Sequence, residues 1–496
     1  MPRTVSTSEL SSHNNENSAW LAVNGTVWDV SGFAAAHPGG REVIEEYFGR
    51  DASSVYNEFH GPGLIAKQLG ESKRIGNLEP VSVPAVPAEP ESAPAPSTTN
   101  VQPPPEAQEG KPTLESIVNL HDFEAAGKHT LSGRALAYVP GYTCDGVTFA
   151  GNQDFYRRIY LRPRVLRNVS TCDMSRSIFG RRFNLPFFSA PAASIKLIHP
   201  DGECALAAGT SAAGGSMVVP TLSSFTIDEI VDSLPKGHPF FFQLYFWQDR
   251  TLARKLLEDV ARLKPVAIMV TVDLPVFSKR ESYERYELKM AAAAQRKRTG
   301  KMTREGQEKA RESGNGRAIA SDLTWDELKW IKEVTGGIPV VVKGIQSAAD
   351  AKKALEYGCD GIYISNHGGR AVDSAYPTIL TLLEIQAQCP EVLGKMEVFI
   401  DGGIRRGTDV LKAICLGASG VCVGRPMFYA AGFGVKGVQK AVKILADELQ
   451  SAMQLCGITS LDQAHPGLLN TTELDPYVYR TEEHPWAKKI VRQGKL

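Results

Sequence analysis

Residues 361–370 read GIYISNHGGR, an apolar run that ends abruptly in polar and glycine residues. Seven other runs have the same form, and segments with helical patterning, such as ARKLLEDVARL, separate most of them. They are LPFFSAP (185–191), SMVVPT (216–221), FFFQLY (240–245), AIMVTVD (267–273), IPVVVKG (338–344), EVFIDGG (397–403) and GVCVGRP (420–426). Eight apolar strands that alternate with helices predict an α/β fold, a (β/α)8 TIM barrel with its active site at the carboxyl ends of the strands.

The interval between the fourth and fifth runs is longer than the others. It contains AAAAQRKRTGKMTREGQEKARESGNGRA (291–318), which is highly charged and nearly free of large apolar side chains. Such a composition cannot bury much apolar surface. We expect this segment to be a solvated, mobile excursion over the barrel mouth, disordered rather than packed, and a candidate lid.

A proline-rich segment separates the barrel from what precedes it. Residues 80–112 contain 10 of the 30 prolines and no aromatic residue, which is typical of a semi-extended tether and not of a domain. We therefore divide the chain into an N-terminal module (1–79), a linker (80–112), a barrel unit (113–470) and a C-terminal tail (471–496).

The charge of the chain limits its partners. The 55 Lys and Arg residues balance the 55 Asp and Glu residues, which argues against a nucleic-acid binder held by bulk charge. No apolar run reaches the length of about 18 residues that could span a membrane, so we expect no membrane partner. Residues 1–79 hold 6 basic and 10 acidic residues, a net of 6 − 10 = −4. An acidic module suits docking to a basic partner and to its own barrel in a salt-sensitive way.

The N-terminal module carries two histidines in suggestive settings. WLAVNGTVWDVSGF (20–33) alternates about an Asn-Gly turn, which predicts a β-hairpin. His37 follows at a Pro-Gly-Gly turn, and His60 lies in VYNEFHGPG. Two neutral imidazoles on opposing loops of a small apolar pocket could bind one haem iron from both faces. The alternative is that His37 only occupies a turn and His60 a helix end, and a second His-Pro-Gly at 465–467 shows that this motif alone is weak evidence.

Polar residues gather at the predicted strand ends of the barrel. Arg370 could bind a carboxylate while His367 handles a proton, and Asp273, at the end of the fourth strand, could partner the histidine. Lys343 adds a cation inside the mouth. DGGIRRG (401–407) and GRP end the last two strands, where barrels commonly bind a phosphate. The alternative is a loop histidine satisfied by its neighbours, with glycines that serve tight turns.

Both units resemble known families. The pattern TSEL, W-x-x-x-x-G-x-V-x-D-V-x-x-F, HPGG and FH resembles the b5-type cytochromes over residues 4–79. Residues from about 113 to 470 resemble the FMN-dependent 2-hydroxy acid dehydrogenases through APAA, PTLSS, FFQLY, VTVDLP, KRE, VVKG, SNHGGR, DGGIRRGTDV and GRP, in that order. The first resemblance implies a small α+β haem domain in which His37 and His60 bind the iron of haem b.

The second resemblance implies FMN as a cofactor and an L-2-hydroxy acid as the substrate, with oxidation of L-lactate to pyruvate as the best match. It implies that His367 takes the hydroxyl proton, that Asp273 polarises this histidine, and that Lys343 acts at the flavin. The residues that it places on FMN are Ala192, Ala193, Gln243, Thr271, Lys343, Asp401, Gly403, Arg405, Gly424 and Arg425.

The same resemblance places further residues on the substrate. Arg370 and Tyr138 would bind its carboxylate, and Tyr245 would contact its hydroxyl group. Arg280, from the KRE motif, would add positive charge beside the substrate and the flavin.

Three departures from the family pattern bear on this site. Where relatives commonly read YYxSGA, residues 138–142 read YVPGY, which leaves the role of Tyr138 less secure. Ala192 stands where a threonine is usual, which removes a hydroxyl near the flavin. Ala193 and Leu222 occupy the positions that usually size the substrate side chain, and both are modest apolar groups that favour lactate over the glycolate-oxidase type.

The fusion of the two units implies that electrons pass singly through haem b to cytochrome c. The alternative is an oxidase that reduces oxygen to hydrogen peroxide, with a haem domain that is regulatory or serves another acceptor. A haem-based sensor on an inactive barrel is disfavoured, because the catalytic side chains are all present. The resemblance also implies a homotetramer. We expect a cytoplasmic protein; the mitochondrial intermembrane space, if a presequence has been removed, is the alternative, and a peroxisomal location is less favoured.

Overall fold

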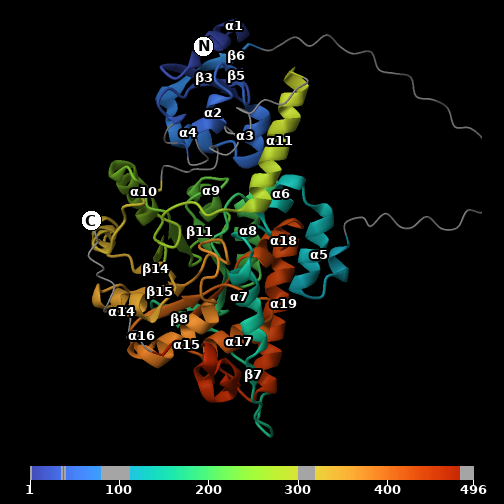
Figure 1. The fold of residues 1–496 in the computed structure, drawn as a ribbon, viewed down its shortest axis with the longest axis vertical. Coiled ribbons are helices and arrows are strands. Elements are labelled where there is room, and N and C mark those ends of the chain that lie inside the picture. The colour runs from blue at the N-terminus through green and yellow to red at the C-terminus, as the bar shows by residue number, and fades with distance from the viewer. Residues whose placement is uncertain (1–2, 35–36, 38–40, 80–111, 300–318, 481–496) are drawn as a thin grey trace, which may run out of the picture.

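The computed structural model describes residues 3–34, 37, 41–79, 112–299 and 319–480. Figure 1 shows an N-terminal module, in blue, that stands over one end of a larger barrel unit. The tether expected at 80–112 lies outside the described residues apart from Pro112, and so does most of the C-terminal tail. Among the helices that are described, none is both long and apolar enough to cross a membrane.

A six-stranded sheet forms the centre of the N-terminal module. Its order is β1-β6-β4-β3-β2, with β5 paired to β3. The strands are β1 (Thr4–Val5), β2 (Asn14–Asn15), β3 (Ser18–Val23), β4 (Thr26–Asp29), β5 (Arg50–Asp51) and β6 (Arg74–Leu78). The predicted hairpin is formed by β3 and β4, and Asn24 and Gly25 at its turn have φ values of 50° and 76°. Both residues need the left-handed region there, which explains the Asn-Gly pair.

Short helices complete this α+β module. They are α1 (Thr7–Ser12), α2 (Arg41–Glu45), α3 (Ser53–Phe59) and α4 (Leu64–Leu69). One face of the sheet buries Leu21, Val23 and Trp28 against apolar side chains of these helices. His60 is the residue at which α3 ends, and His37 lies in the segment before α2. The module thus presents two histidines from separate segments on the helical side of its sheet.

Eight parallel strands close into a barrel in chain order, which confirms the predicted (β/α)8 fold. All their residues are buried except Glu397, because helices cover the outside and side chains fill the inside. The strands are β10 (Phe187–Ser189), β11 (Ser216–Pro220), β12 (Phe241–Leu244), β13 (Ile268–Thr271), β14 (Val340–Ile345), β15 (Gly361–Ile364), β16 (Glu397–Ile400) and β17 (Gly420–Val423).

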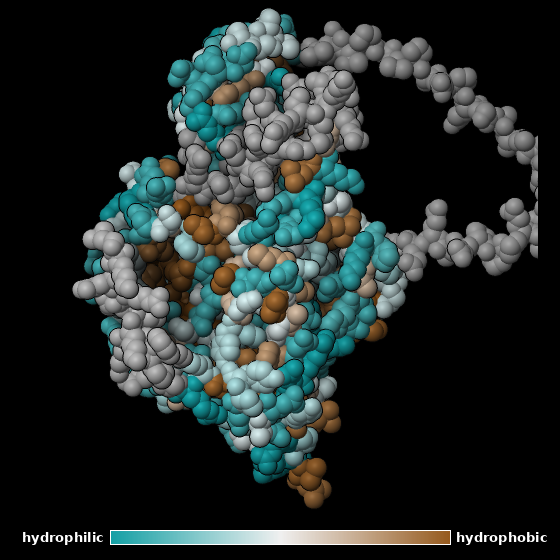
Figure 2. Space-filling view, in the orientation of Figure 1, coloured by the Kyte–Doolittle hydropathy of each residue, from teal (hydrophilic) through white to brown (hydrophobic). Residues whose placement is uncertain are grey.

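The helices around the barrel are amphipathic. In α10 (Arg250–Arg262), Ala253, Leu257 and Val260 fall on one buried face, and the side chain of Asp249 accepts hydrogen bonds from the first turn. The others are α5 (Leu120–Thr130), α6 (Gly133–Tyr138), α7 (Val147–Arg157), α8 (Gly202–Ala212), α9 (Ile227–Asp232), α11 (Glu281–Thr299), α13 (Glu327–Val334), α14 (Ala348–Glu356), α15 (Thr378–Gln388), α16 (Glu391–Lys395), α17 (Gly407–Cys415), α18 (Arg425–Ala431) and α19 (Gly434–Leu455). Figure 2 shows that their outer surface is mostly hydrophilic, with hydrophobic residues gathered in a hollow on one side.

The two ends of the barrel differ in chemistry. At the amino end, Phe188, Phe241 and Phe399 pack edge to face inside the barrel, with ring centroids 5.2 to 5.3 Å apart for the two closer pairs. The hairpin β8 (Arg176–Ile178) and β9 (Arg181–Phe183) adds Phe183 to this cluster. The apolar plug leaves the carboxyl end of the strands as the place for polar chemistry, as expected for this fold.

The long interval after β13 is more ordered than its composition suggested. The helix α11 continues to Thr299, so the expectation of disorder is wrong for residues 291–299, whereas residues 300–318 lie outside the described part. Near its start, Tyr286 and Glu287 contact Arg134 of α6, which also pairs with Glu58 of the N-terminal module. Helix α11 therefore rises from the barrel toward that module (Figure 1).

Candidate active site

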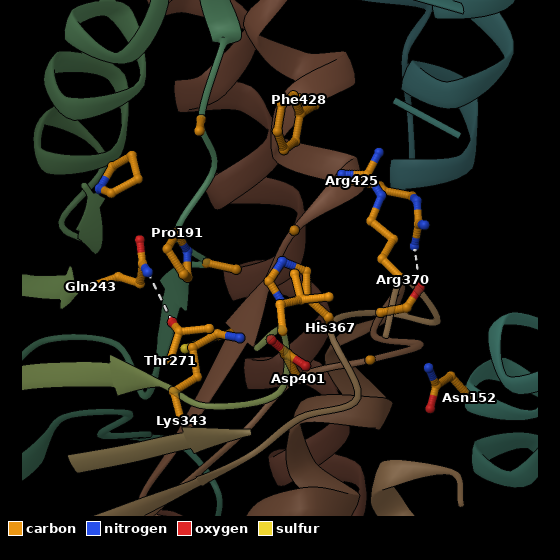
Figure 3. Close-up of a pocket in the computed structure, with 18 of the residues that line it drawn as sticks. Asn152, Pro191, Gln243, Thr271, Lys343, His367, Arg370, Asp401, Arg425 and Phe428 are labelled. Atoms are coloured by element: carbon orange, nitrogen blue, oxygen red, sulfur yellow. Dashed lines mark hydrogen bonds between the residues drawn. The ribbon is translucent and has the colours of Figure 1, made fainter. Parts of the chain in front are cut away.

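A pocket lies at the carboxyl ends of the barrel strands, and every one of the eight strands or the loop after it contributes to its wall. Figure 3 shows His367 near its centre, with Arg370 and Arg425 on one side and Thr271 and Lys343 on another. The predicted residues that line it are Tyr138, Ala193, Leu222, Gln243, Tyr245, Thr271, Arg280, Lys343, His367, Arg370, Asp401, Gly403, Arg405, Gly424 and Arg425. The structure thus brings together residues that are up to 287 positions apart (425 − 138).

His367 is held by a buried carboxylate. Its Nδ1 lies 2.9 Å from Oδ1 of Asp273, whose Oδ2 is 3.5 Å from Nζ of Lys343. Burial opposes ionisation of Asp273, but the charges of Lys343 and His367 outweigh it and lower the pKa of this carboxyl group to about 2. An ionised carboxylate only accepts hydrogen bonds, so Nδ1 of His367 carries the proton and donates it.

This arrangement leaves the other imidazole nitrogen for chemistry. Burial lowers the pKa of His367 to about 4, although the neighbouring Asp273 carboxylate opposes this shift. The imidazole is therefore neutral near pH 7, with an unprotonated Nε2. The hydroxyl of Tyr245 lies 3.4 Å from this nitrogen. A neutral imidazole oriented by a carboxylate and open to a pocket is the arrangement of a general base.

The pH dependence of the reaction should report this low pKa. We expect kcat/KM to fall on the acid side with a midpoint near pH 4 and not near the ordinary histidine value of 6.5, because Nε2 must be unprotonated to act. The same shift makes the unfolded chain bind the proton more tightly than the folded one. The stability that the folded protein gains from a neutral His367 is thus complete above pH 6.5 and is lost as the pH falls toward 4. A steady-state pH profile checks the first expectation, and an acid limb near 6.5 would contradict it.

The backbone of the SNHGGR loop is left-handed at three successive residues. His367, Gly368 and Gly369 have φ values of 57°, 63° and 77°. A Cβ atom on Gly369 would lie 2.8 Å from the backbone nitrogen of Phe149 in α7. Glycine is therefore required at 369 both for its conformation and for the close approach of another chain segment.

Substitution of Gly369, compared with a control glycine, should separate the effect of its left-handed conformation from the effect of its close approach to Phe149. We expect Gly369→Ala to lower the free energy of unfolding by about 1–3 kcal/mol and to reduce kcat, since the backbone must shift beside His367. The matched control is Gly358→Ala, whose φ of 72° is similar but whose Cβ would meet nothing within 4 Å. This control should lose only the conformational part, about 1 kcal/mol, and keep kcat. Equal effects of the two substitutions, seen by denaturant unfolding and steady-state kinetics, would argue against a steric role.

Two arginines supply positive charge beside His367. Arg370 donates from Nε to the carbonyl of Gly141 (3.0 Å) and from Nη2 to that of Val139 (3.1 Å), and its guanidinium lies 4.9 Å from the ring centre of Tyr138. Arg280 is partly buried, and desolvation together with the charge of Arg370 lowers its pKa to about 10. Within the described part of the chain, neither arginine forms an ion pair with a carboxylate. Partly buried like charges without a counter-charge favour an anionic ligand.

Arg425 lines the pocket, where it was predicted to contact FMN. Its three nitrogens donate to the carbonyls of Val139 (3.1 Å), Gly368 (2.8 Å) and Gly141 (2.7 Å). The loop after α6 and the SNHGGR loop thus provide acceptors for this guanidinium. Arg370 and Arg425 thus hold residues 138–142, the loop whose sequence departs from the family pattern, against the SNHGGR loop.

The remaining part of the pocket fits a polar cofactor. Gln243 donates from Nε2 to Oγ1 of Thr271 at 2.8 Å, and Lys343 places its charge nearby. Oδ1 of Asp401 and Nε of Arg405 are buried and have no hydrogen-bond partner in the described residues, although Nε of Arg405 lies 3.8 Å from the carboxylate of Glu124. Such atoms are costly to leave unpaired, so a ligand with complementary donors and acceptors fits here.

One residue that was predicted to contact FMN through its backbone, Ala192, lies outside the pocket wall. Its side chain packs in the apolar core instead. Sequence reasoning also missed Asn152 of α7, whose side-chain amide pairs with that of Asn366 through hydrogen bonds of 2.8 and 2.9 Å. Asn366 stands in the SNHGGR motif and could have been noticed. Asn152 precedes the first barrel strand, in a helix without any motif.

The predicted haem ligands His37 and His60 face each other in the N-terminal module. Their ring centroids lie 6.3 Å apart, and Tyr56 and Phe33 pack beside them. Burial and the neighbouring His37 lower the pKa of His60 to about 4, which keeps its imidazole neutral, and its buried Nδ1 has no hydrogen-bond partner in the described residues. Two imidazoles that face each other beside aromatic side chains are residues that would hold the iron of a haem. The second His-Pro-Gly is only a turn, in which Nδ1 of His465 accepts from the backbone of Gly467.

The fold and both sites agree with matches to known families. A model of the FMN-dependent dehydrogenases matches residues 127–471, and one of the cytochrome b5-like haem/steroid-binding domains matches residues 6–79. The chain belongs to the FMN-dependent dehydrogenase family and carries a cytochrome b5-like haem domain in front of its barrel. FMN and haem are its cofactors, and its reaction is the FMN-dependent oxidation of a 2-hydroxy acid.

Individual relatives share one or both units. An L-lactate dehydrogenase (cytochrome) of Wickerhamomyces anomalus is 35% identical over 472 residues, which cover 94% of this chain and 79% of that protein. Glycolate oxidase 3 of Oryza sativa subsp. indica is 36% identical over 353 residues, which cover 70% of this chain and 95% of the relative. A solved structure of a mutant flavocytochrome b2 with pyruvate bound is 33% identical and has a TM-score of 0.66, with 78% of this chain and 94% of that chain covered.

Proposed function

We propose that this protein oxidises L-lactate to pyruvate at FMN and passes the electrons, one at a time, through haem b to cytochrome c. The observation that carries the proposal is the coexistence of two sites in one chain. A carboxylate-oriented base faces two arginines in the barrel, and two facing histidines form a haem site in the module above it. A relative with both units is named for lactate and cytochrome, and a similar solved structure holds pyruvate.

The substrate would bind by its carboxylate. Nη1 of Arg370 makes no hydrogen bond to the described protein residues and can donate to a carboxylate oxygen, while Arg280 adds a second charge. Ala193 and Leu222 line the same pocket and leave space for a small side chain such as the methyl group of lactate.

The side chains of the barrel would then move the hydroxyl proton. Nε2 of His367 accepts this proton, and Asp273 stabilises the imidazolium that forms because it stays ionised. Lys343 keeps Asp273 ionised, and Tyr245 holds the substrate oxygen near Nε2. Gln243, Thr271, Lys343, Asp401 and Arg405 would hold FMN. FMN, when bound, accepts the electron pair of the α C–H bond and releases electrons singly.

The test is a screen with both possible acceptors. Purified protein should show flavin and low-spin haem absorption, and L-lactate should reduce the haem and support cytochrome c reduction more efficiently than glycolate or mandelate. Hydrogen peroxide formation in place of cytochrome c reduction would support an oxidase, as in the glycolate oxidase relative. Flavin bleaching with a haem that stays oxidised would overturn transfer through the haem. Light scattering on the same preparation tests the homotetramer that the family resemblance implies.

A further inference from the structure

Glu203 is a buried carboxyl group that does not line the active-site pocket. It is the second residue of α8, and its side chain is fully buried. Its Oε1 accepts from the backbone N–H of Ile195 at 3.1 Å and from Oγ of Ser224 at 3.3 Å, while Oε2 has no hydrogen-bond partner in the described residues. Because burial of a carboxyl group is costly, these hydrogen bonds identify the segments that Glu203 holds in place.

The two segments that Glu203 joins are the loops after the barrel strands β10 and β11. The ladder between these strands ends at the pair of Ser189 and Met217, so it does not reach the loops. Beyond it, the backbone N–H of Lys196 in the first loop donates to Oγ of Ser224 in the second loop at 3.4 Å, and Ser224 donates to Glu203. Side chains thus connect the two segments where the strand pairing ends.

The start of α8 fits closely between the same loops. Gly202, which precedes Glu203, has a φ of 46°. A Cβ atom on Gly202 would lie 2.9 Å from Cε2 of Phe225 and 3.2 Å from the backbone nitrogen of Lys196. Glycine is therefore required both by the backbone conformation and by the close approach of the two loops. This contact fixes the position of the Glu203 side chain relative to both loops.

Both loops carry apolar residues of the pocket wall. Ala193 lies two residues before Ile195, and Leu222 lies two residues before Ser224. Both apolar residues line the pocket. Since only two residues separate each of them from a partner of Glu203, the hydrogen bonds of this carboxyl group limit their movement. The separation between Ala193 and Leu222 therefore depends on Glu203.

We propose that Glu203 is a positioning residue for substrate selection, which holds Ala193 and Leu222 at a separation that admits a small side chain and excludes a bulky one. This inference deepens the proposed function and rests on it, because the excluded group is the side chain of the 2-hydroxy acid. Glu203 does not line the pocket. Its loss should therefore change the preference among substrates more than kcat for L-lactate.

Two substitutions separate the hydrogen bonds of Glu203 from its size. Burial raises the pKa of Glu203, although its hydrogen bonds oppose this shift, so glutamine resembles the neutral form and keeps an acceptor for both donors. Leucine has a similar size and no acceptor. In the full-length holoenzyme, the ratio of kcat/KM for L-lactate to that for L-mandelate should fall about tenfold in Glu203→Leu and stay within about twofold of the wild-type value in Glu203→Gln.

The kinetics should use an artificial acceptor that takes electrons from the flavin, so that haem reduction does not enter the ratio. A wild-type ratio in Glu203→Leu would overturn the inference. A loss of bound FMN in this variant, seen by absorption, with an unchanged ratio would assign the two loops to the cofactor and would overturn it as well.

Glu384 provides a matched control. It is a buried residue of α15 whose Oε1 accepts from the backbone N–H of Ala348 at 2.9 Å, and it does not line the pocket. Glu384→Leu should lower the midpoint of thermal unfolding, as Glu203→Leu should, but keep the substrate ratio. An equal fall of the ratio in both variants would indicate a general loosening of the barrel and would overturn the inference.

A double variant tests whether Glu203 acts through the pocket wall. Leu222→Ala shortens a side chain of this wall directly, so it should lower the ratio by itself. If Glu203 acts by holding Leu222 in place, Glu203→Leu/Leu222→Ala should lose less than the product of the two single losses. Losses that multiply fully would overturn the inference, because Glu203 would then act elsewhere.

The outcomes also separate this inference from the proposed function. If the wild-type protein prefers another 2-hydroxy acid to L-lactate, or does not reduce cytochrome c, the proposed function fails. The ratio for two 2-hydroxy acids of different size still tests Glu203 in that case. If the wild-type protein prefers L-lactate to L-mandelate and Glu203→Leu keeps that preference, only the inference about Glu203 fails.

Discussion

Replacing His367 with glutamine is expected to lower kcat by a factor between about 10² and 10⁴, the usual contribution of a general base. The amide of glutamine can still donate to Asp273 but cannot accept a proton at neutral pH. The hydroxyl proton of the substrate then has no imidazole nitrogen to accept it, because Nε2 of His367 is gone. Binding of the substrate carboxylate should change little, since Arg370 and Arg280 are untouched.

The measurement is steady-state turnover of His367→Gln with L-lactate, together with absorption spectra that report bound flavin and haem. His238→Gln serves as the control, because this half-buried histidine contacts the carbonyl of Gly215 and does not line the pocket. The control should keep its turnover. Turnover of His367→Gln at the wild-type level would show that another group takes the proton.

The second large effect is expected in the haem module. Changing His60 to alanine removes one of the two histidines that would hold the haem iron, so the low-spin haem spectrum should be lost and cytochrome c reduction should fall to background. Oxidation of L-lactate should continue with an artificial acceptor that takes electrons from the flavin, because no pocket residue of the barrel is altered. The variant would thereby separate substrate oxidation in the barrel from electron transfer through the haem.

A matched control comes from the repeated His-Pro-Gly motif. His465 has the same neighbours in sequence as His37, but its ring only caps a turn. His465→Ala should keep the haem spectrum and cytochrome c reduction. A His60→Ala protein that retains a six-coordinate, low-spin haem would contradict the assignment of this ligand.

Much of the fold could be predicted because its signals are local. Each barrel strand is a short apolar run, and its buried state on both faces needs no knowledge of distant residues. The Asn-Gly hairpin is equally local, since the φ values of its two turn residues follow from their types. His367, Asp273 and Lys343 could be singled out for the same reason, because each directly follows or ends such a run.

What could not be predicted depends on pairs far apart in the chain. Asn152 and Asn366 are separated by 214 positions, and the sequence around Asn152 contains no pattern that predicts this contact. The carbonyls that hold Arg370 and Arg425 belong to a loop that departs from the family pattern, so neither motif nor resemblance could place them. The charged composition of residues 291–299 suggests a solvated segment, but their alanine-rich start has a high helix propensity and continues α11.

The link between Asn152 and Asn366 has a practical consequence for anyone who dissects this enzyme. A truncated protein that begins at β10 would keep His367, Asp273 and Lys343. It would lose the hydrogen bonds between Asn152 and Asn366 that hold the loop on which His367 lies. The segment before the barrel is also held by Asp373, whose carboxylate accepts hydrogen bonds from the backbone N–H groups of Asp145, Gly146 and Thr148. The smallest unit that retains activity therefore begins well before the first barrel strand. Chimaeric proteins joined at that strand should fold but lack activity.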